Sequence, residues 1–402
     1  MADKMNKVEK LINELCPDGV EFKELGEVCE LKRGRVISKK YIKENQGDYP
    51  VYSSQTLNNG VIGRINTYDF DGEFINWTTD GANAGTVFYR KGKFSITNVS
   101  GLIKIYNTNK LNYKFLFYWL SIEAKNYVYS GMGNPKLMSN QMEKVLIPIP
   151  PLPIQEEIVK ILDTFTELEA ELEAELEARK KQYEYYREKL YNITDAPSKL
   201  LGEIGTFTRG KRFVKKDMKN SGIPCIHYGE MYTHYSIWAN KAKSYLDPEH
   251  AKNLRRAKTG DVIIVQAGET VEDLGRGVAW LGDSDVVVHD ACYIFSHNLE
   301  PKYVSHFLRT RRFHEQIKSY VSSGKISSIN SKGLSKAKIP IPFKNGKPDL
   351  VKQKQIVEIL DKFDALVNDI SQGLPAEIEA RRQQYEFYRN KLLTFKEKNK
   401  SE

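Results

Sequence analysis

The sequence of 402 residues lacks the features that mark secreted, membrane-spanning and disulfide-bonded proteins. It has no run of eighteen apolar residues, so no segment is long and apolar enough to cross a bilayer. The start, MADKMNKVEK, has no apolar stretch of the signal-peptide type. Cys16, Cys29, Cys225 and Cys292 form no CxxC pair, which argues against a disulfide framework or structural zinc. We therefore expect a cytoplasmic, globular protein.

Intact catalytic motifs are also missing. GTFTRGKR at 205–212 matches G-x-x-x-x-G-K, but Arg212 stands where a P-loop needs Ser or Thr. PDGVEFK at 17–23 contains P-D-x-x-E-x-K, although two residues between its carboxylates are too few for a nuclease hairpin. No Asn-Pro-Pro-aromatic run of the amino-methyltransferase type occurs, and the seven histidines, all between 227 and 314, lack zinc spacing. We expect no catalytic residue and no metal in this chain.

Charge is present in excess of one sign, but unevenly. Residues 1–150 carry a net charge of +4, residues 151–196 carry −6, residues 197–350 carry +10 and residues 351–402 carry +1. Two basic blocks are thus separated by an acidic stretch. A basic globular block favours a polyanionic partner such as nucleic acid, although a mild excess also serves solubility.

The clearest positive signal is an internal duplication. EARKKQYEYYREKL at 177–190 returns as EARRQQYEFYRNKL at 379–392. Other paired stretches keep the same order: GEVCELKRG with GEIGTFTRG, LIPIP with KIPIP, and QEEIVKILDTF with KQIVEILDKF. A period near 200 residues is too long for a solenoid and indicates a duplicated domain. The sequences of the bodies between these markers match poorly, which suggests two similar scaffolds with different binding specificities.

Long helices should follow each proline-rich exit. Apolar residues at alternating spacings of three and four predict a helix from about 154 to 190, with one phase slip. Its second copy contains SQGLP at 371–375, where Gly373 and Pro375 predict a kink or break. Since the two seams match, we expect the helices to pair with each other, antiparallel. A short helix from about 5 to 15 is also expected.

The bodies combine short β-rich runs, broken by Gly, Asn and Asp, with one helix each near 110–128 and 301–320. The predicted fold class is therefore α+β, with two globular bodies separated by two long helices that pair as an antiparallel coiled coil. The predicted boundaries are 1–153 for the first body, 154–192 for the first helix, 193–350 for the second body and 351–395 for the second helix.

Together these landmarks resemble the specificity subunit of type I restriction–modification systems. The resemblance rests on paired bodies that open with LGE…RG and close with IPIP, and on the helices Q-x-x-IV-x-ILD-x-F and EAR-x-x-QYE-x-YR-x-KL. It covers essentially the whole chain. It implies that both bodies are target-recognition domains, each recognising half of a split site in double-stranded DNA, and that the helices dock two methyltransferase subunits. Motor–nuclease subunits complete the restriction enzyme, and S-adenosylmethionine, ATP and Mg belong to the partner subunits.

The expected DNA contacts are basic and amide side chains in polar, turn-rich loops, because Arg, Asn and Gln can make two hydrogen bonds to a base edge. In the first body they are Arg33, Arg35, Lys39, Lys40, Gln55, Asn58, Asn59, Arg64, Thr78, Thr79, Asn83 and Lys136. In the second body they are Arg209, Lys211, Arg212, Lys215, Lys216, His227, Tyr228, Arg276 and Lys325.

Aromatic residues of the repeated helix point in several directions, and one seam can bury only some of them. The expected partner contacts are therefore Tyr183, Tyr185, Tyr186, Tyr385, Phe387 and Tyr388. Two other functions stay open. One is a free-standing bivalent DNA-binding protein, or a competing specificity subunit without nuclease; neighbouring methyltransferase and motor genes would favour the restriction system over it. A structural coiled-coil scaffold would bind no DNA.

Overall fold

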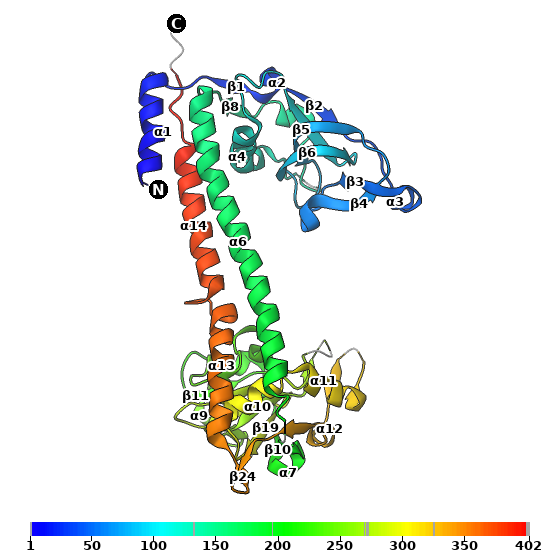
Figure 1. Cartoon of the computed structure of the whole chain (residues 1–402), viewed down its shortest axis with the longest axis vertical. Coiled ribbons are helices and arrows are strands. Elements are labelled where there is room, and N and C mark those ends of the chain that lie inside the picture. Colours follow the sequence, from blue (N-terminus) through cyan, green and yellow to red (C-terminus); the bar gives the residue numbers. More distant parts are fainter. Residues whose placement is uncertain are drawn as a thin grey trace. The chain divides into compact units, whose positions relative to one another are not determined.

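The computed structural model describes residues 2–131, 133–194, 196–268, 270, 273–324 and 326–398. Two compact units divide the chain (Figure 1). Unit 1 comprises residues 1–170 and 380–402, and unit 2 comprises residues 171–379. Each unit therefore contains one of the two predicted bodies together with parts of the long helices. The helix α6, Leu152–Leu190, contributes residues to both units.

The body of unit 1 is built around a sheet of order β2-β7-β5-β6-β3-β4. Its helix α4 contacts β6 and β5, and buries Phe115, Leu116 and Leu120 completely. The strands of this unit are β1 Phe22–Glu24, β2 Cys29–Arg33, β3 Gln46–Tyr52, β4 Val61–Ile65, β5 Phe70–Thr78, β6 Val87–Ile96, β7 Ser100–Ile105 and β8 Leu146–Pro148. Its helices before α6 are α1 Ala2–Leu15, α2 Leu25–Val28, α3 Lys39–Glu44, α4 Tyr113–Glu123 and α5 Ser139–Met142.

The body of unit 2 divides its strands mainly between a sheet of order β10-β19-β15-β17-β12 and a second of order β13-β11-β18-β14. The strands are β9 Ser198–Leu200, β10 Gly205–Arg209, β11 Ile223–Ile226, β12 Trp238–Ala239, β13 Ser244–Leu246, β14 Arg256–Ala257, β15 Val262–Val265, β16 Ala267–Gly268, β17 Gly277–Trp280, β18 Val286–Val288, β19 Cys292–His297, β20 Val321–Ser322, β21 Ser327–Ile329, β22 Lys338–Pro340, β23 Phe343–Lys344 and β24 Lys347–Pro348. The helices are α7 Leu201–Ile204, α8 Glu230–Thr233, α9 Pro248–Ala251, α10 Pro301–Phe307, α11 Arg311–Ile317, α12 Ser331–Ser335 and α13 Leu350–Asn368, followed by α14 Leu374–Leu392.

One expected helix of this body is two helices. The sequence predicts a single helix near 301–320, but α10 ends at Phe307 and α11 begins at Arg311. Thr310 caps the new helix, because its hydroxyl accepts the backbone N–H of Phe313 at 3.1 Å. Propensity alone does not reveal this break, since the hydroxyl stabilises a helix start only once the backbone has turned.

The same short strand pair closes both bodies. In unit 1, β1 pairs antiparallel with β8, the strand of the LIPIP exit. In unit 2, β9 pairs antiparallel with β22, the strand of the KIPIP exit. The entry and exit of each body are thus tied together by backbone hydrogen bonds, immediately before the exit leads into a long helix.

Two duplicated polar residues fasten each long helix to its body. The buried side chain of Gln155 accepts the backbone N–H of Asn112 at 2.8 Å, and that of Gln353 accepts the N–H of Glu300 at 3.0 Å. About two turns further on, Asp163 pairs with Lys114 at 2.5 Å and Asp361 pairs with Lys302 at 2.8 Å. The Q-x-x-IV-x-ILD motif therefore fixes the start of each helix against α4 or α10.

Within each unit the duplicated helix segments pair antiparallel. In unit 1, Phe165 of α6 lies 5.6 Å from Tyr388 of α14 between ring centroids, and Glu169 lies 2.5 Å from Arg382. In unit 2, the equivalent Phe363 of α13 contacts Tyr183 and Tyr186 of α6. The first copy of ILD-x-F thus packs on the second copy of YE-x-Y, and the second on the first.

The second long helix is interrupted where Gly373 and Pro375 occur. α13 ends at Asn368 and α14 begins at Leu374. A Cβ atom on Gly373 would lie 2.4 Å from the carbonyl oxygen of Ala365, so only glycine fits here. The first long helix has no such residue and runs unbroken over 39 residues.

Both chain ends belong to unit 1. The N-terminal helix expected from about 5 to 15 is observed as α1, Ala2–Leu15. Beyond it, the N–H of Val20 donates to the carbonyl of Lys396 at 2.8 Å, and the N–H of Lys398 donates to Val20 at 2.9 Å. The C-terminal segment therefore pairs with the entry into the first body.

Candidate nucleic-acid interface and partner surface

Both bodies carry the same basic turn at the end of their first sheet strand. Arg33 ends β2 and is followed by Gly34 and Arg35, and Arg209 ends β10 and is followed by Gly210 and Lys211. A Cβ atom on Gly34 would lie 2.3 Å from the carbonyl oxygens of Ile96 and Thr97, and one on Gly210 would lie 2.3 Å from that of His289. Each RG turn is therefore pressed against the end of a strand, β6 or β18, and needs glycine for that contact.

Internal contacts hold the basic side chains of these turns in place. Arg33 donates to the carbonyl of Asn98 at 2.5 Å, and the Nε atom of Arg35 lies 3.0 Å from the carboxylate of Asp69. In unit 2, Arg209 donates to the carbonyl of Asp290 and Lys211 to that of Asn253, both at 2.8 Å. Because each guanidinium has five donors, these contacts orient Arg33, Arg35 and Arg209 while leaving donors for a ligand.

The residues behind the two turns differ chemically. Strands β3 and β6 pair in parallel so that Tyr52 faces Ile96, and β11 and β18 pair in parallel so that Ile226 faces Val288. The residue that follows the end of each strand forms a second pair, at the same position in both bodies. In unit 1 it is Ser53 with Thr97, whose hydroxyls lie 2.9 Å apart, and in unit 2 it is His227 with His289, whose ring centroids lie 4.5 Å apart. One scaffold position thus holds two hydroxyls in one body and two imidazoles in the other.

Burial favours the neutral form of both imidazoles. Burial, and then the neighbouring His289, lower the pKa of His227 to about 4. Burial also lowers the pKa of His289. The Nδ1 atom of His227 accepts the N–H of Gly229, and that of His289 accepts the N–H of Ala291. Phe213 and Tyr228 contact the same rings, so the turn of unit 2 lies on an aromatic cluster.

The other candidates of the first body fall into exposed and internal groups. Lys39, Lys40, Asn58, Asn59, Arg64, Asn83 and Lys136 are exposed. Gln55 donates to the carbonyl of Val61, and Asn59 accepts from the buried Arg90, so both also shape their loop. Thr78 and Thr79 are buried, and their hydroxyls contact Asn83 and Asp80. In this conformation the two threonines support the loop rather than face solvent.

In the second body, Arg212, Lys215, Lys216 and Tyr228 are exposed beside the RG turn. His227 is buried, as described above. Arg276 lies elsewhere in unit 2, in an ion pair of 3.1 Å with Asp273. Lys325 lies outside the described residues. The structure therefore groups most candidates of this body around the RG turn and separates Arg276 from them.

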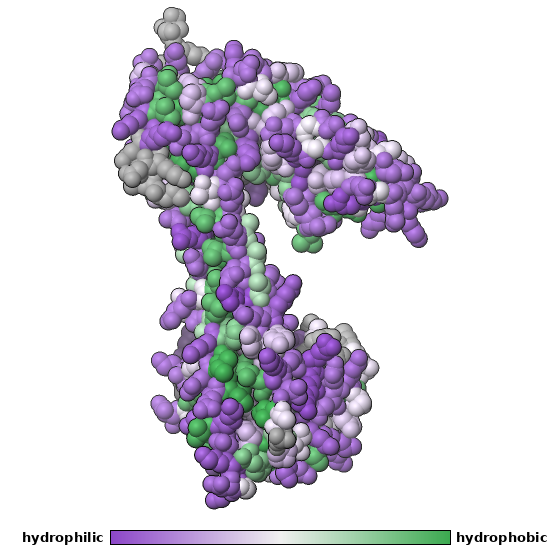
Figure 2. Space-filling view, viewed as in Figure 1, coloured by the Kyte–Doolittle hydropathy of each residue, from purple (hydrophilic) through white to green (hydrophobic). Residues whose placement is uncertain are grey.

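The six aromatic partner candidates divide into two kinds. Tyr183, Tyr186, Tyr385 and Tyr388 pack in the helix pairs. Tyr185 and Phe387 occupy the same position of the two repeats and are 58% and 64% exposed. Figure 2 shows mostly hydrophilic residues at the surface, with hydrophobic residues gathered along the helices of unit 2. Val351 and Ile359 of α13 are exposed.

Several contributing residues escape recognition from sequence alone. Asp69, Asp290, Ser53 and Thr97 lie in no repeated motif and reach the RG turns only through sheet pairing. His289 lies in the β-rich run DVVVHD, but nothing in the sequence of that run places it beside an RG turn.

The described residues contain no group of three or more His, Cys, Asp or Glu side chains arranged to hold a metal ion. Burial raises the pKa of the Cys225 thiol to about 12, so the thiol stays protonated at neutral pH. Within the same residues, none of the helices has the length and apolar character of a membrane span.

Comparison with known proteins gives a consistent result. The family described as "Type I restriction modification DNA specificity domain" matches residues 17–178 and 196–380. A protein of Mycoplasma pneumoniae described as a type I specificity subunit is 32% identical over 378 residues, covering 93% of this chain and 97% of that protein. A type I restriction enzyme specificity subunit of Haemophilus influenzae is 33% identical, covering 94% and 96%. The crystal structure of a type I S subunit from M. genitalium has a TM-score of 0.56 at 15% identity, covering 93% and 96%.

Proposed function

The chain belongs to the family of type I restriction–modification DNA specificity subunits, which are non-catalytic, and from that premise we propose how it divides its tasks. The two bodies recognise the two halves of a split, asymmetric site in double-stranded DNA. The helices dock two methyltransferase subunits, and motor–nuclease subunits join them. S-adenosylmethionine, ATP and Mg are bound by those partner subunits. The complex works in the cytoplasm.

One observation carries the proposal. The RG turns of both bodies have the same backbone contacts, but the pair beneath them is Ser53 with Thr97 in one and His227 with His289 in the other. Because the two RG turns have equivalent positions, each body can meet its half-site of the DNA in the same orientation. Unequal chemistry suits two different half-site sequences. A duplicated protein with unlike bodies is therefore matched to an asymmetric site.

Within each body, two kinds of contact are expected. Lysines such as Lys215 and Lys216 carry a compact charge that suits phosphate, which positions the protein without reporting sequence. Arg33, Arg35 and Arg209 have planar donors that suit the base edge of guanine. The carboxylates and carbonyls that already hold these arginines fix their direction, which favours specificity over simple attraction.

On the helices, Tyr185 and Phe387 supply the expected partner contacts. Both side chains are more than half exposed, and exposed aromatic residues are enriched at protein interfaces. Because they occupy the same position in the two repeats, the two surfaces suit two copies of one partner.

The test is an exchange of the second body. Residues 197–340 are replaced by the equivalent body of a relative, and methylated bases are mapped genome-wide in cells that carry the chain and its methyltransferase. We expect one half of the methylated motif to change and the other half and the gap to stay the same. A change in both halves would contradict independent recognition. The absence of methylation with the unaltered chain would favour a free-standing DNA-binding protein.

A further inference from the structure

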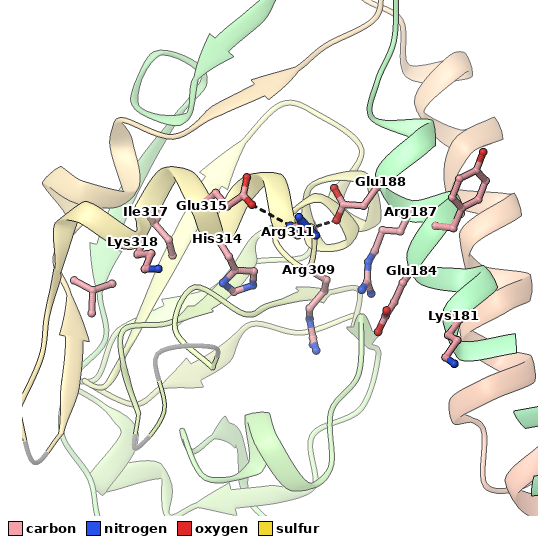
Figure 3. Close-up of a pocket in the computed structure, with 12 residues that line it drawn as sticks. Lys181, Glu184, Arg187, Glu188, Arg309, Arg311, His314, Glu315, Ile317 and Lys318 are labelled. Carbon is pink, nitrogen blue, oxygen red and sulfur yellow. Dashed lines mark hydrogen bonds and ion pairs between the residues drawn. The ribbon is translucent and has the colours of Figure 1, made fainter. Parts of the chain in front are cut away.

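A cavity of about 700 Å³ opens in unit 2 between the end of α6 and α11 (Figure 3). Two smaller cavities adjoin it, and Arg187 and Arg309 line all three. Arg276 lines both smaller cavities. In Figure 3, Arg187 of α6 and Arg309, which lies in the turn between α10 and α11, extend in the same direction. Three guanidinium groups therefore converge on one region of unit 2.

The positive charge of this region is incompletely balanced. Arg276 pairs with Asp273, but neither Arg187 nor Arg309 forms an ion pair within the described part of the chain. The Nε atoms of both arginines are buried without a hydrogen-bond partner there. Burial, and then the charge of Arg276, lower the pKa of Arg309 to about 9. Asp364 lines one of the smaller cavities and accepts hydrogen bonds from Tyr183 and Ser236.

Unit 1 lacks this constellation at the equivalent positions. Counting from the paired lysines Lys114 and Lys302, Arg309 corresponds to Ser121. The strand register places Val87 opposite Trp77 and Gly277 opposite Ile264, so Arg276 corresponds to Thr86.

The repeated motifs extend the comparison to the long helices. Arg187 corresponds to Arg389 in the duplicated helix, and Asp364 corresponds to Thr166 after the ILD-x-F motif. Three arginines and one aspartate in unit 2 thus stand against one arginine and three hydroxyl residues in unit 1. The charged region is a specific feature of unit 2 and no requirement of the shared scaffold.

We propose that this cavity binds a carboxylate of an acidic segment on a methyltransferase subunit, held between Arg187 and Arg309. A carboxylate accepts two parallel N–H donors from a guanidinium and would satisfy groups that are otherwise buried without partners. The inference rests on the proposed function and deepens it. Its consequence is that the two partner surfaces are unequal: the methyltransferase subunit bound at unit 2 is held more tightly than the one at unit 1.

The rest of the lining favours a protein segment over DNA. Glu184, Glu188 and Glu315 line the same cavity, and a continuous phosphate backbone would meet these carboxylates next to the arginines. A protein segment can present an acidic residue to the arginines and a basic one to the glutamates. Ile317 and Val321 add an apolar wall, and the exposed Tyr185 also lines the cavity, which joins it to the proposed partner surface.

The experiment compares two matched arginines. The full chain is titrated with its cognate methyltransferase subunit, and both binding steps are measured by analytical ultracentrifugation. We expect Arg187→Gln to weaken the tighter step about tenfold to a hundredfold, as for loss of a charge-assisted hydrogen bond. Arg389→Gln, the same change in the other repeat, should alter either step by less than about threefold. Circular dichroism confirms that both variants are folded.

A second variant tests the contact directly. Arg187→Lys keeps the charge but loses the paired donors, should retain part of the affinity, and places an amine in the cavity. A zero-length carbodiimide should then join that amine to an Asp or Glu of the methyltransferase subunit, identified by mass spectrometry.

Equal weakening by Arg187→Gln and Arg389→Gln, or no interchain product, would overturn the inference while leaving the proposed function intact. Unchanged assembly with weaker DNA binding would also overturn it, and would assign the cavity to phosphate. Failure of the unaltered chain to bind the subunit would overturn both.

Discussion

Tyr186 stacks on Phe363, with ring centroids 5.3 Å apart and ring planes inclined by 20°. Tyr388 and Phe165 repeat this stack in the other unit at 27°. Each stack joins the ILD-x-F motif of one repeat to the YE-x-Y motif of the other. Neither repeat can complete its apolar seam alone, so the two copies are needed as partners for each other. This explains why the helix is duplicated although it carries no catalytic group.

The stack should be a stabilising contact of unit 2. We expect Phe363→Ala to lower the free energy of unfolding by about 2 kcal/mol, because a partly buried ring and its aromatic contacts are lost. Tyr185→Ala, two residues from Tyr183 but on an exposed face, should change it by less than about 0.5 kcal/mol. Urea denaturation of both variants measures the difference. Equal effects would show that the stack contributes little.

The exposed aromatic pair should govern assembly rather than folding. The double variant Tyr185→Ala with Phe387→Ala is expected to weaken binding of the methyltransferase subunits, since large aromatic side chains often carry interface energy. Both bodies should keep their melting temperatures. Co-purification at defined concentrations and mapping of the methylated motif give the two readouts. A changed DNA motif with normal assembly would place these residues at the DNA instead.

Acid sensitivity should be confined to unit 2, because it contains all seven histidines. Burial lowers the pKa of His227 and of His297 to about 4, below the value near 6.5 of an unfolded histidine. Between these values the unfolded state binds more protons, so stability is complete above about pH 6.5 and falls as the pH drops towards 4.

Hydrogen exchange at pH 7.5 and at pH 5 checks this expectation. Protection should fall in residues 197–340, with a loss on the order of 1 kcal/mol per buried histidine, and stay constant in residues 20–150. His297→Asn keeps an acceptor for the N–H of Leu299, which His297 now accepts at 3.2 Å, and should reduce the acid effect. Equal loss of protection in both units would point to carboxylates as the cause.

The tetrapeptide repeat ELEAELEAELEA at 167–178 should act as a spacer between the two halves of the DNA site. Removing residues 171–174 keeps strong helix formers, shortens the helix by about 6 Å and turns its remainder by about 40°. The gap between the two half-sites, whose bases are not recognised, should shorten by one or two base pairs, since DNA rises about 3.4 Å per pair.

Methylome mapping of this deletion, and of an insertion of one further ELEA, measures the gap. The insertion should lengthen it by a similar amount, and the sequence of each half-site should stay the same in both variants. An unchanged gap with full methylation would leave the helix as a docking surface alone.

Local patterns predicted the helical parts of the fold well. The spacing of Ile158, Phe165 and Tyr183 indicated the first long helix, and Gly373 and Pro375 indicated where the second is interrupted, because these signals act within a few residues. Leu168 follows Phe165 at the spacing of three that predicts the apolar seam, but it is 38% exposed. A helical period identifies a face, whereas the partner's geometry decides how deeply each residue is buried.

The candidate site was less accessible from sequence, because it depends on pairings between distant strands. Arg33 and Arg209 are found from the repeated RG motif, but Ser53 and His289 reach them through parallel pairing that no local pattern encodes. The burial of Thr78 and Thr79 has the same origin. Polarity suggested exposure, while the loop uses both hydroxyls internally.

The contacts of Gly34 and Gly210 are made with carbonyl oxygens, which every amino acid possesses. The surface that each basic turn contacts is thus main chain, and it does not depend on the surrounding side chains. Mutations nearby can alter volume, charge and hydrogen bonding at the recognition surface without moving the turn. The backbone fixes the position of the turn and the side chains set the chemistry of the recognition surface, so position and chemistry can evolve at different rates. A protein organised in this way can acquire a new DNA target through a series of substitutions, because each intermediate protein still folds.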